Sequence, residues 1–353
     1  MPRLRLALFG LALLTLTAGC DSDGGGGTEA TVRVMSQNLY LGGDLFTLLE
    51  PECDGNAIVV CVAQLYGTIQ ASDPAARMAA VAAEIARVDP DLVGLQEVST
   101  YYVQSPADNL PGGPATDATQ VTFDFLDLLM DALEAEGADY RVVSVSNNSD
   151  VEFPATADGT TFFDVRYQDA DVILARNDVT TGATTEASFQ SLLTIPVGGV
   201  NQTFVRGYQS VRATVGGFDF TFFNTHLEVG GDAEPLQVLQ AGELLTPIGA
   251  ASGPVVFVGD INSNGNANGT SYRTLTVPLD DAFAPGSAPT CCQAADLRNA
   301  ASQLQTRIDV VFHRGFDSVA EAEVVLDDPS DRVGGLWPSD HAGVWAELSA
   351  VVQ

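Results

Sequence analysis

Residues 255–262 read VVFVGDIN, a short apolar run followed by two polar side chains. The first four residues predict a strand buried on both faces, because they are apolar and mostly β-branched. Gly259 is expected to let the chain turn tightly, and alternation along an extended backbone would point Asp260 and Asn262 the same way. Ligand and catalytic groups in layered α/β proteins tend to lie at such strand ends. The pair therefore indicates phosphate and metal handling, although Gly-Asp and Asn are also ordinary turn residues.

Strands and helices are mixed along the rest of the chain. Gly216-Gly217 predicts a hairpin, whereas Asp73 followed by Pro74 predicts the start of a helix. Polar loops are expected around Cys53 and Cys61, at 101–120 and at 263–300. Helices are predicted at 73–88, 123–136 and 234–245. Further strands are predicted at 31–37, 91–98, 140–145, 171–175, 204–215, 218–224, 308–313, 320–325 and 343–348. The pattern is typical of an α/β protein with mixed sheets.

The composition describes an acidic globular chain. Its 353 residues are 46% hydrophobic and carry a formal net charge of −31, and every basic residue is Arg. Such acidity disfavours non-specific binding to nucleic acid, where neutralisation of phosphates supplies most of the affinity. It is compatible with binding of divalent cations.

The first residues are typical of a targeting segment. Arg3 and Arg5 precede an apolar stretch at 6–16 that is too short to span a bilayer as a mature helix. Residues 17–20 read TAGC and resemble the lipobox of bacterial lipoproteins, although Thr17 stands where that motif usually has Leu.

The lipobox resemblance implies that residues 1–19 are a signal peptide and that Cys20 is acylated. The protein would then be an exported lipoprotein of the bacterial cell envelope, attached to a membrane by its lipid. Cleavage by ordinary signal peptidase would release it instead. Residues 20–30, rich in Gly, predict a flexible tether ahead of one domain at 31–353.

Export places the other four cysteines in an oxidising compartment, where disulfides are expected. A short loop closed by Cys53 and Cys61 is favoured. The neighbours Cys291 and Cys292 could bridge each other only with a strained peptide, so pairs between the two segments stay open as an alternative.

Polar residues recur where the predicted strands end. They are Asn38, Glu97, His226, Asp260, Asn262, Asp309, Asp340 and His341. Several of them would be unremarkable alone, as turn formers or solvated strand ends. Asp309 is different, because a carboxylate inside an apolar strand is costly to bury unless it is paired. His341 is a candidate partner, and His313 is expected to be structural.

The order and wording of these motifs resemble the endonuclease/exonuclease/phosphatase superfamily, the DNase I-like metal-dependent phosphodiesterases. The matching motifs are QNLY at 37–40, LQEV at 95–98, NTHL at 224–227, GDIN at 259–262, RIDVVF at 307–312 and SDH at 339–341. The resemblance implies a four-layered α/β sandwich, in which helices flank two mixed sheets and the site lies at one end.

The same resemblance implies a metal site for Mg²⁺, with Mn²⁺ or Ca²⁺ as alternatives. Glu97 would be the metal-binding carboxylate, with Asn38 beside it and Asp340 next to the metal or the phosphate. Some family members have an acid two residues after the first Asn, where this chain has Tyr40. Asp44 is a candidate substitute.

The resemblance also implies catalytic roles. Asp260 and Asn262 would orient the attacking water and hold the phosphate, and Asp260 can act as a general base. The catalytic histidine would be His341, with Asp309 as its partner. His226 would contact the phosphate from the other side. Arg206 is a weaker match to a phosphate-binding arginine, and Asp171 is a further candidate.

These expectations define an exported, Mg²⁺-dependent enzyme that hydrolyses phosphodiesters. A nuclease or general phosphodiesterase is favoured, and a sphingomyelinase-like hydrolase of phospholipid headgroups is the alternative. A catalytically inactive surface-binding protein is the rival from another class, and it would be expected to have lost some of these residues. No protein partner is predicted.

Overall fold

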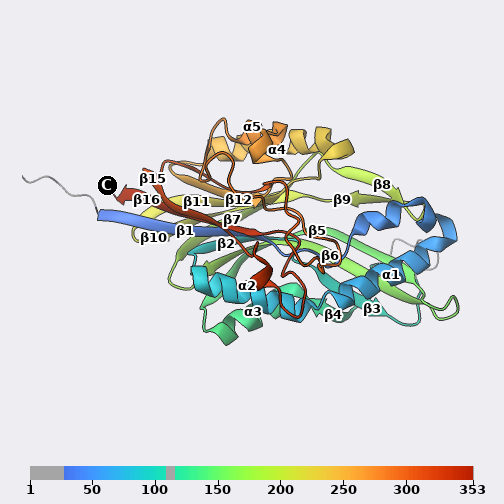
Figure 1. Ribbon diagram of the computed structural model, residues 1–353. Helices are drawn as coiled ribbons and strands as arrows, with labels where there is room; N and C mark the ends of the chain where they lie inside the picture. Colours follow the sequence, from blue (N-terminus) through green and yellow to red (C-terminus); the bar gives the residue numbers. More distant parts are fainter. Residues whose placement is uncertain (1–27, 109–115, 353) are drawn as a thin grey trace, which may run out of the picture.

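The computed structural model describes residues 28–108 and 116–352 (Figure 1). The predicted signal peptide and Cys20 lie outside the described residues. Among the described helices, none is both long enough and apolar enough to cross a membrane.

The larger of two main sheets has eight strands. The spatial order of its main path is β15 (Ser318–Val325), β16 (Gly343–Val352), β1 (Thr28–Asn38), β2 (Leu92–Gln96), β6 (Phe163–Arg176), β3 (Thr100–Gln104) and β4 (Gln120–Asp124). The eighth strand, β5 (Tyr140–Ala155), pairs with β6. β1 runs parallel to β2 and antiparallel to β16, so the described termini lie together at one end and Asn38 lies toward the other.

The smaller main sheet has six strands. Their order is β13 (Asp280–Asp281), β14 (Asp309–Arg314), β12 (Val255–Asp260), β11 (Phe218–His226), β10 (Gly207–Val215) and β7 (Thr180–Ser188). A separate hairpin consists of β8 (Leu193–Val197) and β9 (Val200–Phe204). Both main sheets are mixed, as predicted.

Helices cover the outer face of each main sheet, so the molecule has four layers (Figure 1). The larger sheet packs against α1 (Ile58–Ala71), α2 (Pro74–Val88) and α3 (Phe125–Glu136), and the smaller against α4 (Glu234–Ala250) and α5 (Thr270–Leu275). The 3₁₀ turns are η1 (Leu45–Leu49), η2 (Pro51–Cys53), η3 (Gly55–Ala57), η4 (Gly231–Ala233), η5 (Gly265–Ala267) and η6 (Pro329–Asp331).

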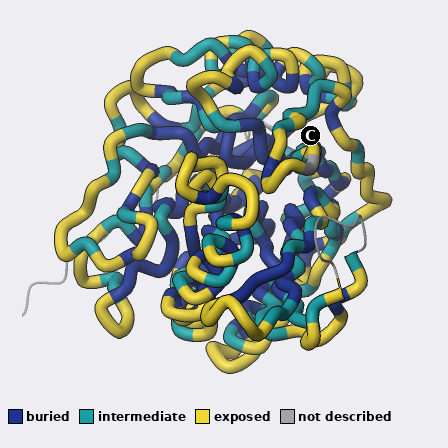
Figure 2. The backbone as a smooth tube through the Cα atoms, turned by 90° about the vertical axis from the view of Figure 1, so that its right-hand side faces the viewer, coloured by how far each residue is buried: buried dark blue, intermediate teal, exposed yellow. Residues whose placement is uncertain are grey.

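Three apolar cores fill the spaces between the layers. One lies under α1–α3, one between the sheets and one under α4 and α5. In Figure 2 the buried segments of the backbone accordingly lie in the interior of the molecule, and the exposed segments lie around them. The predicted four-layered sandwich is confirmed.

The side chain of Asn224 makes polar contacts across the mainly apolar space between the two sheets. Asn224 of β11 donates from Nδ2 to the carbonyls of Leu95 (3.0 Å) and Val172 (3.2 Å), both in the larger sheet. Its Oδ1 accepts from Gln96 Nε2 at 2.7 Å. A Cβ on Gly94 would lie 2.5 Å from the same Oδ1, so this close approach requires glycine. Asn224 therefore fixes the sheets to each other next to the strand ends that carry the site.

Several local predictions are corrected by the structure. The segment expected to be a loop around Cys61 forms α1, and the loop expected at 101–120 begins with β3 and ends with β4. The strand predicted at 204–215 is two strands, β9 and β10. Gly259 lies inside β12 and makes no tight turn; a Cβ there would meet the carbonyl oxygen of Thr225 at 2.1 Å.

Two disulfides are formed within the part of the chain that the structure describes. Cys53 is bonded to Cys61, as favoured from the sequence, with their Cα atoms 5.8 Å apart. Cys291 is bonded to Cys292, so the alternative of crossing pairs is not realised. The first disulfide ties η2 to α1, on the side of the molecule where η1 lies.

The contact between the sheets gives a stability prediction. Asn224→Ala removes three buried hydrogen bonds, to the Gln96 amide and to the carbonyls of Leu95 and Val172, and should lower the free energy of unfolding by about 3 kcal/mol. Denaturant unfolding followed by circular dichroism measures this loss. Asn201→Ala, at an exposed position of β9, is the control and should stay within about 0.5 kcal/mol of the parent. A loss below about 1 kcal/mol for Asn224→Ala would contradict the assigned role.

Candidate active site

The predicted site residues converge because the ends of neighbouring strands are in register. His226 of β11 pairs with Asp260 of β12, and Asp260 pairs with Asp309 of β14. Asn38 ends β1 beside Gln96 of β2, and Glu97 follows directly. Asn38 Nδ2 donates to Glu97 Oε1 at 3.0 Å and to Asp260 Oδ2 at 3.1 Å, and so joins the ends of the two sheets.

His341 and Asp309 form a buried pair. His341 Nδ1 lies 2.9 Å from Asp309 Oδ2, and the two side chains are 6% and 0% exposed. Burial opposes protonation of the imidazole, but the charges of Asp309, Asp260 and Asp340 raise the pKa of His341 well above its usual value. The ring is therefore held as a cation, with Nε2 directed toward the other carboxylates.

Asp260 lies at the centre of the cluster. Its Oδ2 is 3.4 Å from His226 Nε2 and 3.8 Å from His341 Nε2. Burial raises the pKa of Asp260 to about 7, against the charge of His341, and the charges of Asp309 and Glu97 act in the same direction as burial. A carboxylate with such a pKa can exchange a proton near neutral pH.

The side chain of Asn262 lies beside Asp260 because the backbone turns at Asn262, and not because side chains alternate along an extended strand. Its φ is 50°, and its N–H donates to Asp260 Oδ1 at 2.9 Å. Its side chain donates to the Leu227 carbonyl at 3.0 Å and lies 3.3 Å from His226 Nε2. Asp260 and Asn262 do share one site, as predicted, but the predicted geometry between them is wrong.

His226 is neutral, and Arg206 sets its tautomer. Burial lowers the pKa of His226 well below its usual value, and the charges of Arg206 and His341 lower it further. Arg206 Nη1 lies 2.7 Å from His226 Nδ1. A guanidinium can only donate, so Nδ1 accepts and the ring proton is on Nε2, facing Asp260. The structure thus places Arg206 next to the predicted phosphate-binding histidine.

The predicted metal ligands lie in a pocket of concentrated negative charge. Burial raises the pKa of Asp340 to about 7, with the charges of Glu97 and Asp260 adding to the rise and those of His341 and Arg77 opposing it. Asp340 Oδ1 is buried and has no hydrogen-bond partner among the described residues. A hard divalent cation fits these groups, because it prefers carboxylate oxygens and would relieve their repulsion.

Asn38 and Asp44, which the sequence offered as groups near the metal, make hydrogen bonds with other residues. The amide oxygen of Asn38 accepts from the N–H of Tyr40 at 2.9 Å, so Asn38 braces Glu97 and Asp260. Asp44 caps η1, accepting from the N–H of Phe46 at 2.9 Å. The ligand set Glu97, Asn38 and Asp340 stays a prediction. A different group, Asp260, Asp309 and His341, has ligand atoms within 4.8 Å of one another.

The structure adds residues that the sequence did not single out. Asp169 is buried, and its Oδ2 lies 3.5 Å from Arg206 Nη1. It stands two residues before Asp171 in β6, and a pair of acids within an apolar strand was the available signal. Asp171 itself is buried but does not line the pocket at the site. Cys292 Sγ lies 3.9 Å from His341 Nε2, whereas His313 is remote from the pocket, as expected.

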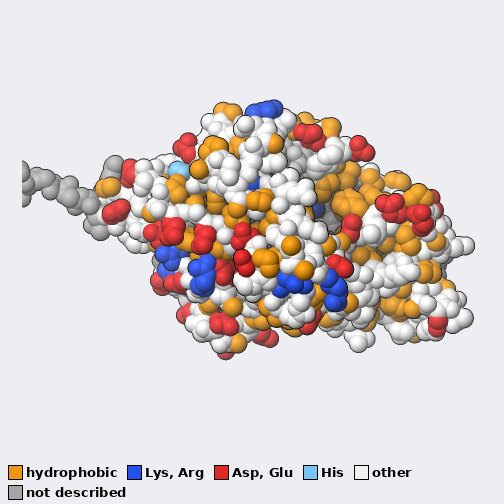
Figure 3. All heavy atoms as spheres, in the orientation of Figure 1, with side chains coloured by type: hydrophobic (Ala, Val, Ile, Leu, Met, Phe, Trp, Pro, Cys, Tyr) orange, Lys and Arg blue, Asp and Glu red, His pale blue; other side chains and the backbone are white. Residues whose placement is uncertain are grey.

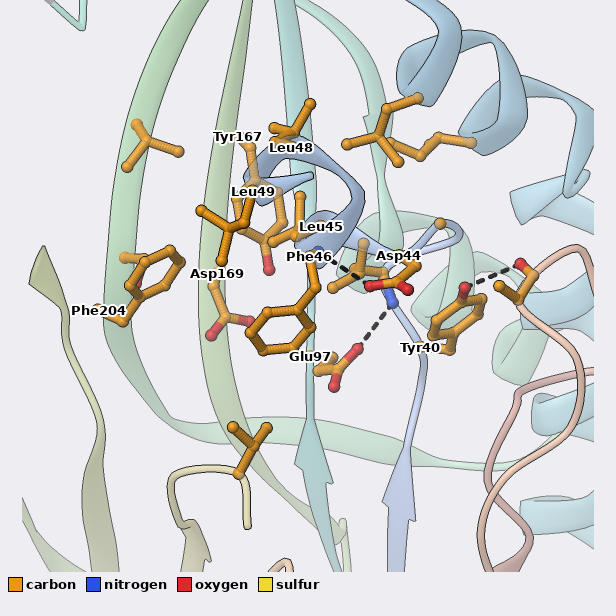
Figure 4. Close-up of a pocket in the computed structure, with 18 of the residues that line it drawn as sticks. Tyr40, Asp44, Leu45, Phe46, Leu48, Leu49, Glu97, Tyr167, Asp169 and Phe204 are labelled. Carbon is orange, nitrogen blue, oxygen red and sulfur yellow. Dashed lines mark hydrogen bonds between the residues drawn. The ribbon is translucent and has the colours of Figure 1, made fainter. Parts of the chain in front are cut away.

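The site opens into a cavity of about 400 Å³ whose far walls are apolar. Figure 4 shows the ring of Phe46 between Glu97 and Asp169, with Leu45, Leu48 and Leu49 on the same turn. Other walls come from α1, β5, β6 and the β8–β9 hairpin. Polar catalytic groups and hydrophobic side chains therefore share one cavity.

This combination of a four-layered sandwich with carboxylates and histidines at its strand ends defines a hydrolase of phosphoester bonds. Residues 35–341 match the model of the Endonuclease/Exonuclease/phosphatase family, and the chain belongs to that family. A comparison with curated protein sequences finds no match.

Solved structures have the same fold. An endonuclease/exonuclease/phosphatase family protein from Bacteroides thetaiotaomicron is 19% identical, with a TM-score of 0.54 over 92% of this chain and 100% of that one. Truncated Caenorhabditis elegans TDP2 is 20% identical, with a TM-score of 0.52 over 91% and 98%. A mannosyl-6-phosphatase from Bacteroides thetaiotaomicron is 20% identical, with a TM-score of 0.52 over 90% and 99%.

The geometry around His341 predicts the effect of removing it. His341→Ala should lower kcat for a phosphoester by about 10²- to 10⁴-fold, because the Asp309-paired cation is lost. Rates are measured on protein shown to be folded by circular dichroism. The matched control is His313→Ala, which removes a histidine outside the pocket and should keep kcat within about twofold. Equal losses in the two variants would contradict the assignment.

Proposed function

We propose that the protein is an exported, Mg²⁺-dependent hydrolase of phosphodiesters. The observation that carries the proposal is the position of Asp260, whose Oδ2 lies 3.4 and 3.8 Å from the Nε2 atoms of two histidines. One ring is held cationic by Asp309, and the other is held neutral by burial and Arg206. Two imidazoles in different protonation states on either side of a carboxylate supply an acid, a base and a hydrogen-bond donor in one place.

The proposed reaction needs no covalent intermediate. A water attacks phosphorus and forms a new P–O bond while the ester P–O bond breaks. Asp260 takes the proton from the attacking water, and the His341 cation gives its Nε2 proton to the leaving alkoxide. Asp309 keeps the ring oriented and favours its charged form.

Other residues hold the phosphoryl group. His226 Nε2–H, the Asn262 amide and the Arg206 guanidinium lie together in the lining of the cavity and can donate to the oxygens of the phosphoryl group. Donors fixed in advance stabilise charge as it develops in the transition state. Glu97 and Asp340 would hold the metal ion, braced by Asn38. Bound there, the metal ion would supply positive charge that offsets the negative charge of the phosphoryl oxygens.

The inactive-protein alternative is disfavoured because Glu97, Asp260 and His341, which the resemblance implies, line one pocket. Membership of the family supports a phosphoester substrate, but it leaves diesters and monoesters as separate cases. One of the solved relatives is named as a mannosyl-6-phosphatase. Export with a lipid on Cys20 is part of the proposal and rests on the sequence of residues 1–20.

Asp260→Asn tests the proposed base. The variant keeps the shape of the side chain but cannot accept a proton, so hydrolysis of bis(p-nitrophenyl) phosphate should fall by about 10²-fold or more. Asp280→Asn, at an exposed position of β13, is the control and should keep the parent rate. p-Nitrophenyl phosphate assayed alongside separates diester from monoester hydrolysis. A parent rate in Asp260→Asn would place the base elsewhere.

Metal binding is tested without turnover. Saturating Mg²⁺ should raise the Tm of the EDTA-treated protein by several degrees, because a ligand that binds only the folded state stabilises it. Glu97→Gln should lose most of this rise, whereas Glu186→Gln, on β7 and outside the cavity, should retain it. Equal Mg²⁺ responses in both variants would remove Glu97 from the metal site.

A further inference from the structure

The cavity at the active site is polar at one end and apolar at the other. Glu97, Asp169, Arg206 and His226 line the polar end. The remaining walls carry large hydrophobic side chains, among them Phe46, Leu49, Val151, Tyr167, Ile195 and Phe204. Its volume of about 400 Å³ lies within the range of pockets that take small organic ligands.

The turn η1 is the most unusual wall of this cavity. Four of its five residues are Leu or Phe, yet none of them is buried. Phe46 is 48% exposed and Leu49 is 41% exposed. A contiguous group of exposed apolar side chains is costly in water and usually marks a binding surface. Figure 3 likewise shows hydrophobic side chains gathered over β8 and β9 beside a hollow in the surface.

Contacts with neighbouring residues hold η1 in place as part of the cavity wall. Asp44 caps the turn, and the Cys53–Cys61 disulfide ties the following segment to α1. Leu41 N–H donates to Glu97 Oε2 at 2.9 Å, which connects the start of this segment directly to the polar end of the cavity. The apolar wall and the phosphate-binding groups are thus parts of one structure.

We propose that this cavity binds the hydrocarbon group of an amphiphilic phosphoester, a single alkyl chain, while its phosphate lies between Arg206, His226 and Asn262. The proposal rests on the proposed phosphodiesterase function and specifies its substrate class. The occupant follows from continuity: a hydrophobic group attached to a phosphate at the polar end extends into the apolar end.

The charge of the molecule supports this occupant over a nucleic acid. The formal net charge of −31 repels a polyanion, and binding of nucleic acid depends on neutralising many phosphates. An amphiphile with one phosphate is repelled less by the protein, because it carries far less negative charge than a nucleic acid. Its affinity comes instead from apolar burial, which does not depend on the net charge of the protein.

A homologous series of p-nitrophenyl alkyl phosphodiesters, from methyl to octyl, tests the proposal below the concentrations at which the esters form micelles. kcat/KM should rise by up to about fourfold for each methylene buried, mainly through a lower KM, until the cavity is filled. Octyl has about seven more methylenes than methyl, so the octyl-to-methyl ratio should lie between about 10², if only half of them are buried, and an upper limit of about 10⁴. Release of p-nitrophenolate is the measured signal for every ester.

Substitutions at exposed positions show whether this cavity is responsible. Phe46→Asn and Leu49→Asn should each lower the octyl-to-methyl ratio by about tenfold. Val277→Asn, which changes an 81% exposed apolar residue outside the cavity, is the control and should leave the ratio unchanged.

The outcomes separate the two proposals. If the methyl ester is hydrolysed in a His341-dependent way but the ratio is near one, the alkyl-binding proposal is overturned and the apolar residues are assigned to a protein contact. A duplex DNA substrate cleaved with a higher kcat/KM than the octyl ester would also overturn it. Failure to hydrolyse any ester would overturn the proposed function itself.

Discussion

The crowding of carboxylates at one buried end of the sandwich is the constraint on which the site depends. Burial raises the pKa values of Asp260 and Asp340 to about 7, and the negative charges gathered around them, Glu97 among them, act in the same direction. The protein offsets part of the cost of gathering these carboxylates with hydrogen bonds from Asn38 and from two backbone N–H groups. A divalent cation can offset the remaining repulsion between the carboxylates. The same electrostatics that weaken the fold locally therefore favour a metal site.

The two site histidines have opposite protonation behaviour because their neighbours differ. His341 faces carboxylates and is held as a cation, whereas burial, aided by the charge of the neighbouring Arg206, keeps His226 neutral. Asp169 lies 3.5 Å from Arg206 Nη1 and compensates the burial of this guanidinium. Pairs of titratable groups whose environments push their pKa values apart provide separate acids and bases at one pH.

The strand-end residues of the site were predictable because backbone register alone brings them together. His226, Asp260 and Asp309 needed only the correct order of three strands. Asn262 was placed correctly for the wrong reason, since its direction depends on a left-handed φ that alternation does not describe.

Segments fixed by distant contacts were not predictable. The run at 58–71 contains β-branched residues and little helical periodicity, and it is helical because its buried face packs on the larger sheet. The exposed apolar side chains of η1 likewise have no signature in the sequence, because Leu and Phe in a loop are read as core. Asp169 was missed despite its spacing from Asp171, because an acid in a strand is usually interpreted as exposed, whereas this one is buried beside Arg206.

The apolar wall also bears on the chemistry, beyond any part in recognition. Hydrophobic side chains beside Glu97 and Arg206 limit the number of waters that can solvate them, and charges interact more strongly where water is excluded. An alkyl chain seated against η1 would displace further water from this end of the cavity. Binding of the hydrocarbon group would then strengthen the interactions of Arg206, His226 and His341 with the phosphate, so that a remote contact contributes at the reacting bond.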